Sequence, residues 1–156
     1  MKLNLGSGKK RIDGYISCDL HDSDMDMDIR KLPFDDNTID EIIAIHVLEH
    51  FYVHEIMYVL HEWKRVLKPD AKLIVELPCF DKVVELLKSG INDYFCLCAF
   101  YGSPKTHKDG EPALHKWCWS KEQFKKLLET VGFRNVVDEP PVYHHQIRDM
   151  RFVCIK

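Results

Sequence analysis

The chain has 156 residues, of which 46% are hydrophobic and 30% are charged. This length and composition fit one globular domain over residues 1–156, and they exclude wholesale disorder, a collagen-like repeat and a coiled coil. The 22 basic and 25 acidic side chains give a net charge of −3, which argues against a domain dedicated to wrapping nucleic acid. No apolar run approaches the ~20 residues that a membrane-spanning helix needs, and the first residues lack the apolar stretch of a signal peptide.

The cysteine pattern favours a reduced, cytosolic protein. The six cysteines form no C-x-x-C pair, and most of them lie in apolar or aromatic stretches. Packed thiols are therefore a better interpretation than a disulfide scaffold. The C-x-C pair of Cys96 and Cys98 leaves a metal site there as a minor alternative.

The first part of the sequence alternates short apolar runs with turn signals. Residues 2–5 are a predicted strand that ends in the glycine turn Gly6-Ser7-Gly8. Further strands are predicted over residues 15–20, which contain Asp19 and Leu20, over an acidic stretch that closes on Asp28 and Ile29, and over the β-branched residues 39–45. The nearly unbroken apolar character of residues 39–45 is typical of a parallel strand covered on both faces.

The rest of the sequence adds helices. Apolar residues recur at helical spacing from Ile56 to Leu67, whereas residues 90–119 show no clean period. Strands are predicted over residues 72–77, 134–138 and 150–155, and a short helix is predicted over residues 83–87. A further helix is predicted to begin at Ser120, with Gln123 completing a capping box, and to end at Gly132. This alternation predicts a mostly parallel sheet with helical cover.

The glycine turn after the first strand is the strongest candidate ligand site. A turn of this kind at the carboxyl end of a strand lets a ligand approach the backbone, at the edge where open α/β sheets bind ligands. It does not fit the dinucleotide fingerprint, because Arg11 occupies the third glycine position and Asp19 comes only 11 residues after Gly8. These departures disfavour an NAD-dependent enzyme, and the absence of G-K-[ST] excludes a P-loop.

Polar residues follow the other predicted strands. Asp19 ends the second strand, where a carboxylate can accept both hydroxyls of a ribose. Asp28, followed by Ile29, ends the third, where an acid beside an apolar residue suits the amine and the face of an adenine. The segment from His46 to His50 follows the fourth strand. Because all of these residues follow successive strand ends, we expect them to share one ligand site rather than to be solvated loop residues.

With these motifs in place, the chain resembles the class I S-adenosylmethionine-dependent methyltransferases. The segments that carry the resemblance are Leu3 to Gly8, Cys18-Asp19-Leu20, Asp28-Ile29 with Leu32-Pro33-Phe34, residues 39–50 and residues 60–69. The resemblance is strong over residues 2–80, weaker over 120–156 and poor over 81–119, where segments that recognise the acceptor usually lie.

The resemblance implies a Rossmann-like α/β fold. Its seven-stranded, mostly parallel sheet would have the order 3-2-1-4-5-7-6, with helices on both faces and only the seventh strand, residues 150–155, antiparallel. It also implies S-adenosyl-L-methionine as the cofactor. The implied cofactor-binding residues are Asn4, Leu5, Gly6, Ser7, Gly8, Asp19, Leu20, Asp28, Ile29, His46 and Val47.

Two departures from the family pattern concern the cover of the cofactor site. The first strand begins at residue 2 with no helix before it, and only residues 9–14 separate the glycine turn from Tyr15. This resembles a compact bacterial-type subgroup. We expect the missing cover to come from another chain, and the aromatic segment from Tyr94 to Trp119 to contribute to a homodimer.

The expected chemistry is transfer of a methyl group to an O or N nucleophile. Candidate bases are His46, His50 and His115, since histidine titrates near neutral pH. We expect a bracing role for His50 and a place beside the cofactor for His46. Trp117 is a candidate stacking platform for a planar acceptor, and residues 143–151 are expected to form a solvated hairpin. The acceptor stays open between a small molecule, a sugar, a lipid head group, a protein and RNA.

Two alternatives remain from the sequence. His46, Glu49 and His50 are spaced i, i+3 and i+4, and with His115 they resemble the divalent-metal sites of some RNA 2′-O-methyltransferases and quinone O-methyltransferases. A site without metal is favoured, because V-L-E-H is also common in members that use none. The second alternative is a catalytically inactive, cofactor-binding or regulatory subunit that acts through a partner.

Overall fold

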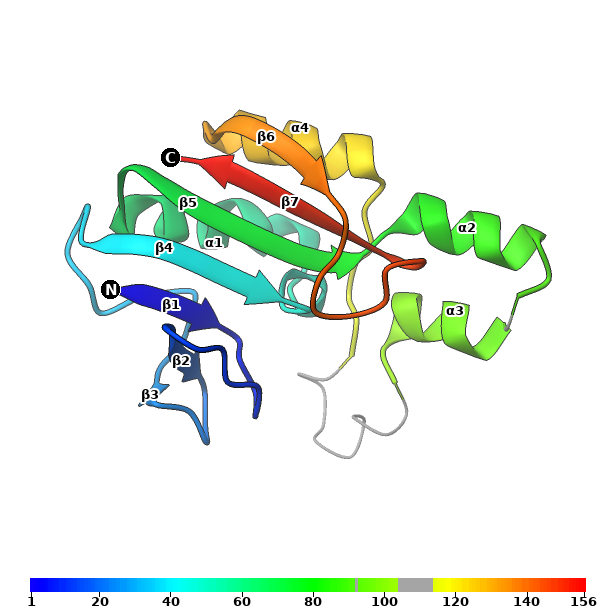
Figure 1. The fold of residues 1–156 in the computed structure, drawn as a ribbon, viewed down its shortest axis with the longest axis horizontal. Coiled ribbons are helices and arrows are strands. Elements are labelled where there is room, and N and C mark those ends of the chain that lie inside the picture. Colours follow the sequence, from blue (N-terminus) through cyan, green and yellow to red (C-terminus); the bar gives the residue numbers. More distant parts are fainter. Residues whose placement is uncertain (92, 104–113) are drawn as a thin grey trace.

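The fold is built on a single seven-stranded sheet. A computed structural model describes residues 1–91, 93–103 and 114–156, and its strand order β3-β2-β1-β4-β5-β7-β6 confirms the predicted order (Figure 1). The strands are β1 (Lys2–Leu5), β2 (Ile16–Asp19), β3 (Met25–Asp26), β4 (Ile39–Ile45), β5 (Leu67–Pro78), β6 (Arg134–Glu139) and β7 (Asp149–Ile155). Strands β1 to β5 pair in parallel, and β7 pairs antiparallel with both β5 and β6. The prediction of an interior, antiparallel seventh strand is therefore correct.

The helices differ from the sequence prediction at one place. They are the 3₁₀ turn η1 (Leu48–His50), α1 (Val53–Val66), α2 (Phe80–Lys88), α3 (Asp93–Tyr101) and α4 (Lys121–Val131). Helix α3 lies in the stretch where no helix was predicted. Its sequence, DYFCLCAFY, is apolar or aromatic at nearly every position, so it has no apolar stripe at helical spacing. It packs against α2 in a small core of Val83, Cys96 and Ala99.

Helix α4 has both predicted caps. The hydroxyl of Ser120 accepts the N–H of Gln123, the Gln123 side chain accepts the N–H of Ser120, and Gly132 ends the helix at φ 93°. We expect Ser120→Ala to lower the free energy of unfolding by about 1 kcal/mol, because it removes one acceptor for the orphan N–H groups. Ser120→Asp, which keeps that acceptor, should stay close to wild type in urea denaturation. Equal losses in both variants would contradict the cap.

The main core lies between the sheet and two helices. Figure 1 shows α1 and α4 together behind the sheet, and their buried side chains Trp63 and Phe124 meet Phe152 of β7 in one cluster. The indole N–H of Trp63 donates to the carbonyl of Ile29 at 2.9 Å, which fastens the segment after β3 to this core. The six cysteines all lie in the described residues, and no disulfide joins any of them there.

The opposite face of the sheet is covered by loops rather than by a helix in the described residues. The side chain of Asn4 in β1 donates to the carbonyl of Lys10 in the β1–β2 connection. Buried Glu76 of β5 accepts the N–H groups of Val142 and Tyr143 in the β6–β7 connection, which crosses in front of the sheet in Figure 1. The expected helical cover on both faces is therefore limited to the face of α1 and α4, because the connections around β1, β2 and β3 are too short to contain helices.

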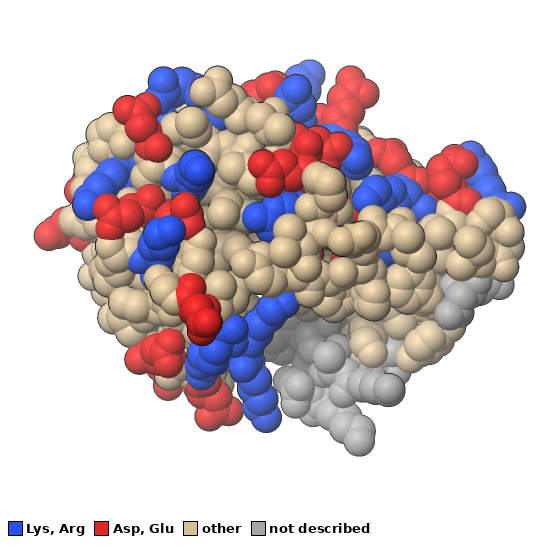
Figure 2. Space-filling model, in the orientation of Figure 1, with Lys and Arg blue, Asp and Glu red and all other residues tan. Residues whose placement is uncertain are grey.

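This loop-covered face carries acidic and basic side chains interspersed over the sheet (Figure 2). The Nζ of Lys10 donates to the carbonyl of Tyr143 at 3.2 Å, so the two connections also contact each other. The chain's own β6–β7 connection thus covers part of this face. The homodimer stays a prediction, and residues 104–113 of the aromatic segment expected to form it lie outside the described residues. Among the described helices, none has the length and apolar character needed to span a membrane.

Candidate active site

The glycine turn after β1 brings backbone close to the loop after β4. Gly6 and Gly8 have φ values of 65° and 50°, a region that L side chains rarely adopt. A Cβ built on Gly6 would lie 2.4 Å from Cγ2 of Val47, well inside van der Waals contact. The N–H groups of Gly6 and Ser7 both donate to the carbonyl of Cys18. Only glycine fits at position 6 while Val47 stays in place.

Asp19 joins the turn to the end of β2. Its carboxylate accepts the N–H of Gly8 at 2.6 Å and the N–H of Leu20 at 2.7 Å. Asp19 is half-buried, and the side chain of Leu20 is 50% exposed beside it. A carboxylate at the carboxyl edge of the sheet, next to the glycine turn, is where a ribose acceptor is predicted.

Other predicted cofactor residues support the site instead of facing it. Leu5 and Ile29 are buried in the main core, and buried Asn4 holds the β1–β2 connection. Asp28 lies two residues after β3, and the guanidinium of Arg30 binds both of its oxygens. The Arg30 hydrogen bonds hold the pKa of Asp28 below its usual range, so the carboxylate is ionised. Its role as an adenine acceptor stays a prediction.

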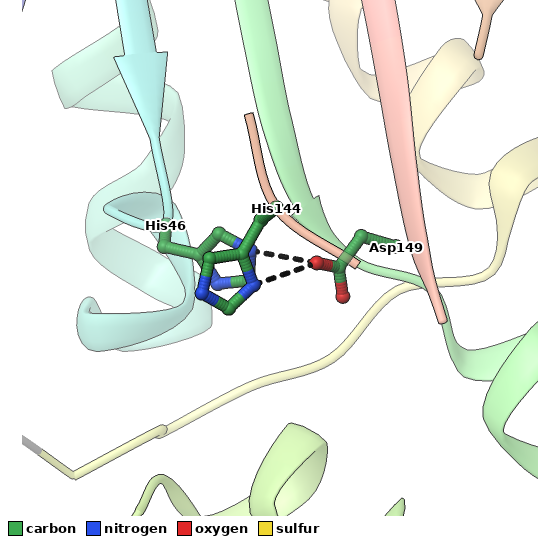
Figure 3. A group of neighbouring side chains, drawn as sticks. All are labelled: His46, His144 and Asp149. Atoms are coloured by element: carbon green, nitrogen blue, oxygen red, sulfur yellow. Dashed lines mark hydrogen bonds and ion pairs between the residues drawn. The ribbon is translucent and has the colours of Figure 1, made fainter. Parts of the chain in front are cut away.

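His46 lies between two buried carboxylates, and Figure 3 shows one of them, Asp149, together with His46 and His144. It follows β4 at φ 56°, with Nδ1 2.8 Å from Oε1 of Glu49 and Nε2 2.9 Å from Oδ2 of Asp149. Burial alone would lower the pKa of His46, but the two carboxylates outweigh it and raise the pKa to about 9. An imidazolium with both nitrogens paired has no lone pair to accept a proton. These contacts of His46 hold the loop after β4 and disfavour the role of a general base, and the place of His46 in the site stays a prediction.

Asp149 is the centre of a buried polar network that sequence reasoning missed. Its side chain is fully buried, and it accepts from Nδ1 of His144 at 3.1 Å, the N–H of His145 at 3.0 Å and Nε of Arg148 at 2.8 Å. Although burial raises the pKa of Asp149, the hydrogen bonds from His144 and His46 lower it well below the usual range. The prediction of a solvated hairpin over residues 143–151 is wrong at Arg148 and Asp149.

The physical reason for this error is that the polar groups satisfy one another inside the protein. The sequence shows polar residues next to an apolar strand and reads as a surface loop. A possible signal is the Arg148-Asp149 pair directly before the apolar run of β7, since a charged pair at the start of an interior strand must be neutralised locally. Nothing in the sequence indicates that His46, 103 residues away, completes the pair.

A second polar group gathers in and around η1. Glu49 is fully buried, and its oxygens have no hydrogen-bond partner within the described residues, although Nδ1 of His46 forms an ion pair with Oε1 at 2.8 Å. The rings of His50 and His115 meet edge to face with centroids 4.9 Å apart. Nδ1 of His50 lies 3.2 Å from the carbonyl of Leu114, and Nδ1 of His115 lies 2.8 Å from the carbonyl of Ala99.

An aromatic cleft opens next to this group. It has a volume of about 540 Å³, and its lining includes Phe80, Phe100, Tyr101, His115 and Trp117. Trp117 is 45% exposed while Trp119 is buried in the main core, as expected for a platform and a packing residue respectively. Burial raises the pKa of Cys118 in the same lining to about 12, so its thiol is protonated at neutral pH.

Residues 7–75 match a family model described as a methyltransferase domain. Over 113 residues the chain is 32% identical to the sterol 4-C-methyltransferase strm-1 of Caenorhabditis elegans, an alignment that covers 69% of this chain and 32% of that protein. The chain thus spans about a third of the length of this curated relative.

Solved structures match over nearly the whole chain. A SAM-dependent methyltransferase from Archaeoglobus fulgidus has a TM-score of 0.68 at 16% identity, covering 99% of this chain and 85% of that chain. Another match is the 1,6-didemethyltoxoflavin-N1-methyltransferase of Burkholderia thailandensis, solved with 1,6-didemethyltoxoflavin and S-adenosylhomocysteine. It has a TM-score of 0.66 at 13% identity, and the match covers 99% of this chain and 70% of that chain.

The strand order and these matches define a Rossmann-like class I methyltransferase fold. With the domain match over residues 7–75 and the curated relative, the chain belongs to the class I S-adenosylmethionine-dependent methyltransferase family.

Proposed function

We propose that this chain binds S-adenosyl-L-methionine at the carboxyl edge of β1, β2 and β4 and transfers its methyl group to an O or N nucleophile. The observation that carries the proposal is the hydrogen bond from Gly8 N–H to the Asp19 carboxylate, which unites the glycine turn and the acid in one site. The close approach of Val47 to Gly6 also supports the proposal, because any side chain at position 6 would collide with Val47.

The residues present fit this cofactor. Gly6, Ser7 and Gly8 would pack against its amino-acid portion. Asp19 would accept the ribose hydroxyls, with Leu20 beside it, and Asp28 would accept the adenine amine. The cofactor supplies a methyl group already activated on a sulfonium. The chain's own part is to hold the acceptor in line with that methyl group, and alignment of two reactants supplies on the order of 7–11 kcal/mol.

The aromatic cleft is the proposed acceptor site. Phe80, Phe100 and the exposed ring of Trp117 offer stacking surfaces for a planar group. His115 reaches this cleft with its Nε2 free, since its Nδ1–H donates to the carbonyl of Ala99. The acceptor would thus lie between the aromatic rings and the polar group around Glu49.

Loss of the ribose acceptor should weaken cofactor binding. We expect Asp19→Ala to bind S-adenosylhomocysteine roughly 5- to 150-fold more weakly in calorimetry, equivalent to about 1–3 kcal/mol, because two hydroxyls lose their acceptor. Asp22→Asn is the control, since Asp22 is exposed on the same acidic segment and asparagine tolerates its positive φ of 57°. Unchanged affinity in Asp19→Ala would refute the ribose assignment.

The transfer itself is tested with a radiolabelled methyl group. The full chain is incubated with labelled S-adenosyl-L-methionine and fractionated pools of small molecules, lipids, glycans, RNA and protein. Label in one pool, lost with Asp19→Ala, supports an active methyltransferase and identifies the acceptor class. Tight binding of S-adenosylhomocysteine with no transfer to any pool would instead support a cofactor-binding regulatory subunit that acts through a partner.

A further inference from the structure

We propose that Glu49, His50 and His115 form a binding site for a divalent transition-metal ion at the inner end of the aromatic cleft. One carboxylate oxygen and one imidazole nitrogen from each histidine lie within 4.8 Å of one another. Two imidazoles and a carboxylate are a common protein ligand set for Zn²⁺ and related ions. The inference concerns the metal alone and does not depend on the cofactor binding proposed above.

The first observation that points to a cation is the state of Glu49. Its carboxylate is fully buried, yet neither oxygen accepts a hydrogen bond within the described part of the chain. Buried carboxylates in proteins are normally hydrogen-bonded or coordinate metals. The nearest cation is His46, which also bonds to Asp149 through its other nitrogen. The single positive charge of His46 is therefore divided between the two carboxylates and neutralises Glu49 only in part.

The second observation is the orientation of the two histidines. A carbonyl oxygen can only accept, so the Nδ1 atoms of His50 and His115 must carry the protons that they donate to Leu114 and Ala99. Each Nε2 is then left with a free lone pair, and Nε2 of His115 lies 3.9 Å from Oε1 of Glu49. Histidine ligands are typically fixed in this way, with the second ring nitrogen donating to a backbone carbonyl or a carboxylate.

The spacing is compatible with one ion after a small closing movement. Ligand atoms at about 2.1 Å from a metal are at most roughly 4.2 Å apart. The 3.9 Å between His115 and Glu49 already meets this limit, and His50 is half-buried at the edge of the site with room to adjust. Three ligands leave at least one coordination position open.

The neighbouring group of His46, His144 and Asp149 does not compete for the ion, although its ligand atoms also lie within 4.8 Å of one another. Asp149 already accepts hydrogen bonds from both histidines, from Arg148 and from a backbone N–H. The lone pairs needed for a metal are therefore in use. This group is a closed structural network, whereas the Glu49 group is open toward the cleft.

The open position gives the metal a role if the proposed function holds. His115 lines the aromatic cleft, so a cation bound to it would face the acceptor. A cation there would bind an acceptor hydroxyl and lower its pKa, which favours an oxygen nucleophile on a planar molecule. This step rests on the proposed function, whereas metal binding by itself does not.

The experiment titrates Co²⁺ and Zn²⁺ into the chelator-treated full chain and reads Co²⁺ visible absorption and the calorimetric affinity. We expect one equivalent to bind, and Glu49→Gln and His115→Gln each to weaken binding by more than about 100-fold, because loss of an outer-shell partner alone costs 10–100-fold. His54→Gln is the control, since His54 is exposed on α1 and stacks on Tyr52. It should bind the metal like wild type.

His144→Gln separates the two groups, and unfolding curves of all variants confirm that they fold. No binding by the wild type, or binding lost in His144→Gln but retained in His115→Gln, would overturn the proposed site. S-adenosylhomocysteine affinity is measured on the same samples. Cofactor binding without metal binding refutes this inference and leaves the proposed function intact. Metal binding without cofactor binding refutes the proposed function and supports the metal site.

Discussion

Replacing Asp149 with asparagine should lower the free energy of unfolding by about 3–5 kcal/mol, the cost of removing one partner of a buried ion pair. The substitution keeps the size of the side chain, so the loss of unfolding free energy measures the effect of removing the negative charge. It leaves the guanidinium of Arg148 buried without this carboxylate, and it leaves His46 with Glu49 as its remaining carboxylate partner. For a chain of this length the melting temperature should fall by roughly 6–20 °C. Urea denaturation and thermal melts measure both.

Asp138→Asn is the matched control for this prediction. Asp138 pairs with Lys121 at the surface, where both side chains are about 40% exposed, and exposed ion pairs contribute only about 0–1 kcal/mol. A loss in Asp149→Asn no larger than the loss in the control would show that the network around Asp149 is not a stabilising one.

The stabilisation by Asp149 should also depend on pH. The pKa of its carboxyl in the folded state lies below the unfolded value of about 3.9, so protonation opposes folding. The contribution is complete above the unfolded pKa and declines as the pH falls below it, toward the folded pKa. The difference in unfolding free energy between wild type and Asp149→Asn should therefore shrink on acidification below about pH 4, a range in which His46 is protonated in both the folded and the unfolded state. A difference that grows on acidification would contradict this sign.

The second large effect is expected at the glycine turn. Gly6→Ala should raise the dissociation constant for S-adenosylhomocysteine by at least about tenfold, since an alanine there has a positive φ and its Cβ would approach Val47 to 2.4 Å. The turn must move to relieve this contact, and the moved backbone no longer fits the cofactor. Each step costs of the order of 1 kcal/mol or more, and the costs add in the variant.

Gly8→Ala provides the comparison. Gly8 also has a positive φ, but nothing lies within 4 Å of a Cβ built there. Its variant therefore carries the backbone strain without the collision, and should lose less affinity than Gly6→Ala. Adding Val47→Ala to Gly6→Ala should restore part of the loss. Equal affinities for the two single variants would show that contact with Val47 does not shape the site.

The family resemblance implied the order of the sheet. The sequence by itself determined individual strands, the glycine turn and the position of Asp19. These features depend on short-range signals. A β-branched run such as residues 39–45 favours a buried parallel strand, and a positive φ at Gly6 and Gly8 selects glycine whatever surrounds it. Ser120 and Gly132 mark both ends of α4 because caps satisfy backbone groups within a few residues.

Only the tertiary structure decided which polar residues are buried and what they do. Helix α3 is apolar all round, so its packing on α2, and not its own pattern, makes it a helix. The sequence offers His46 as a candidate base, and the fold places Asp149 against it from the far end of the chain. The protonation state of a histidine depends on the charges within a few ångströms, and those come from segments that the sequence separates by 103 residues. For the same reason, only the fold shows that His115 lies with Glu49 and His50, a set that the sequence offered through a resemblance, and that His46 contacts both Glu49 and Asp149.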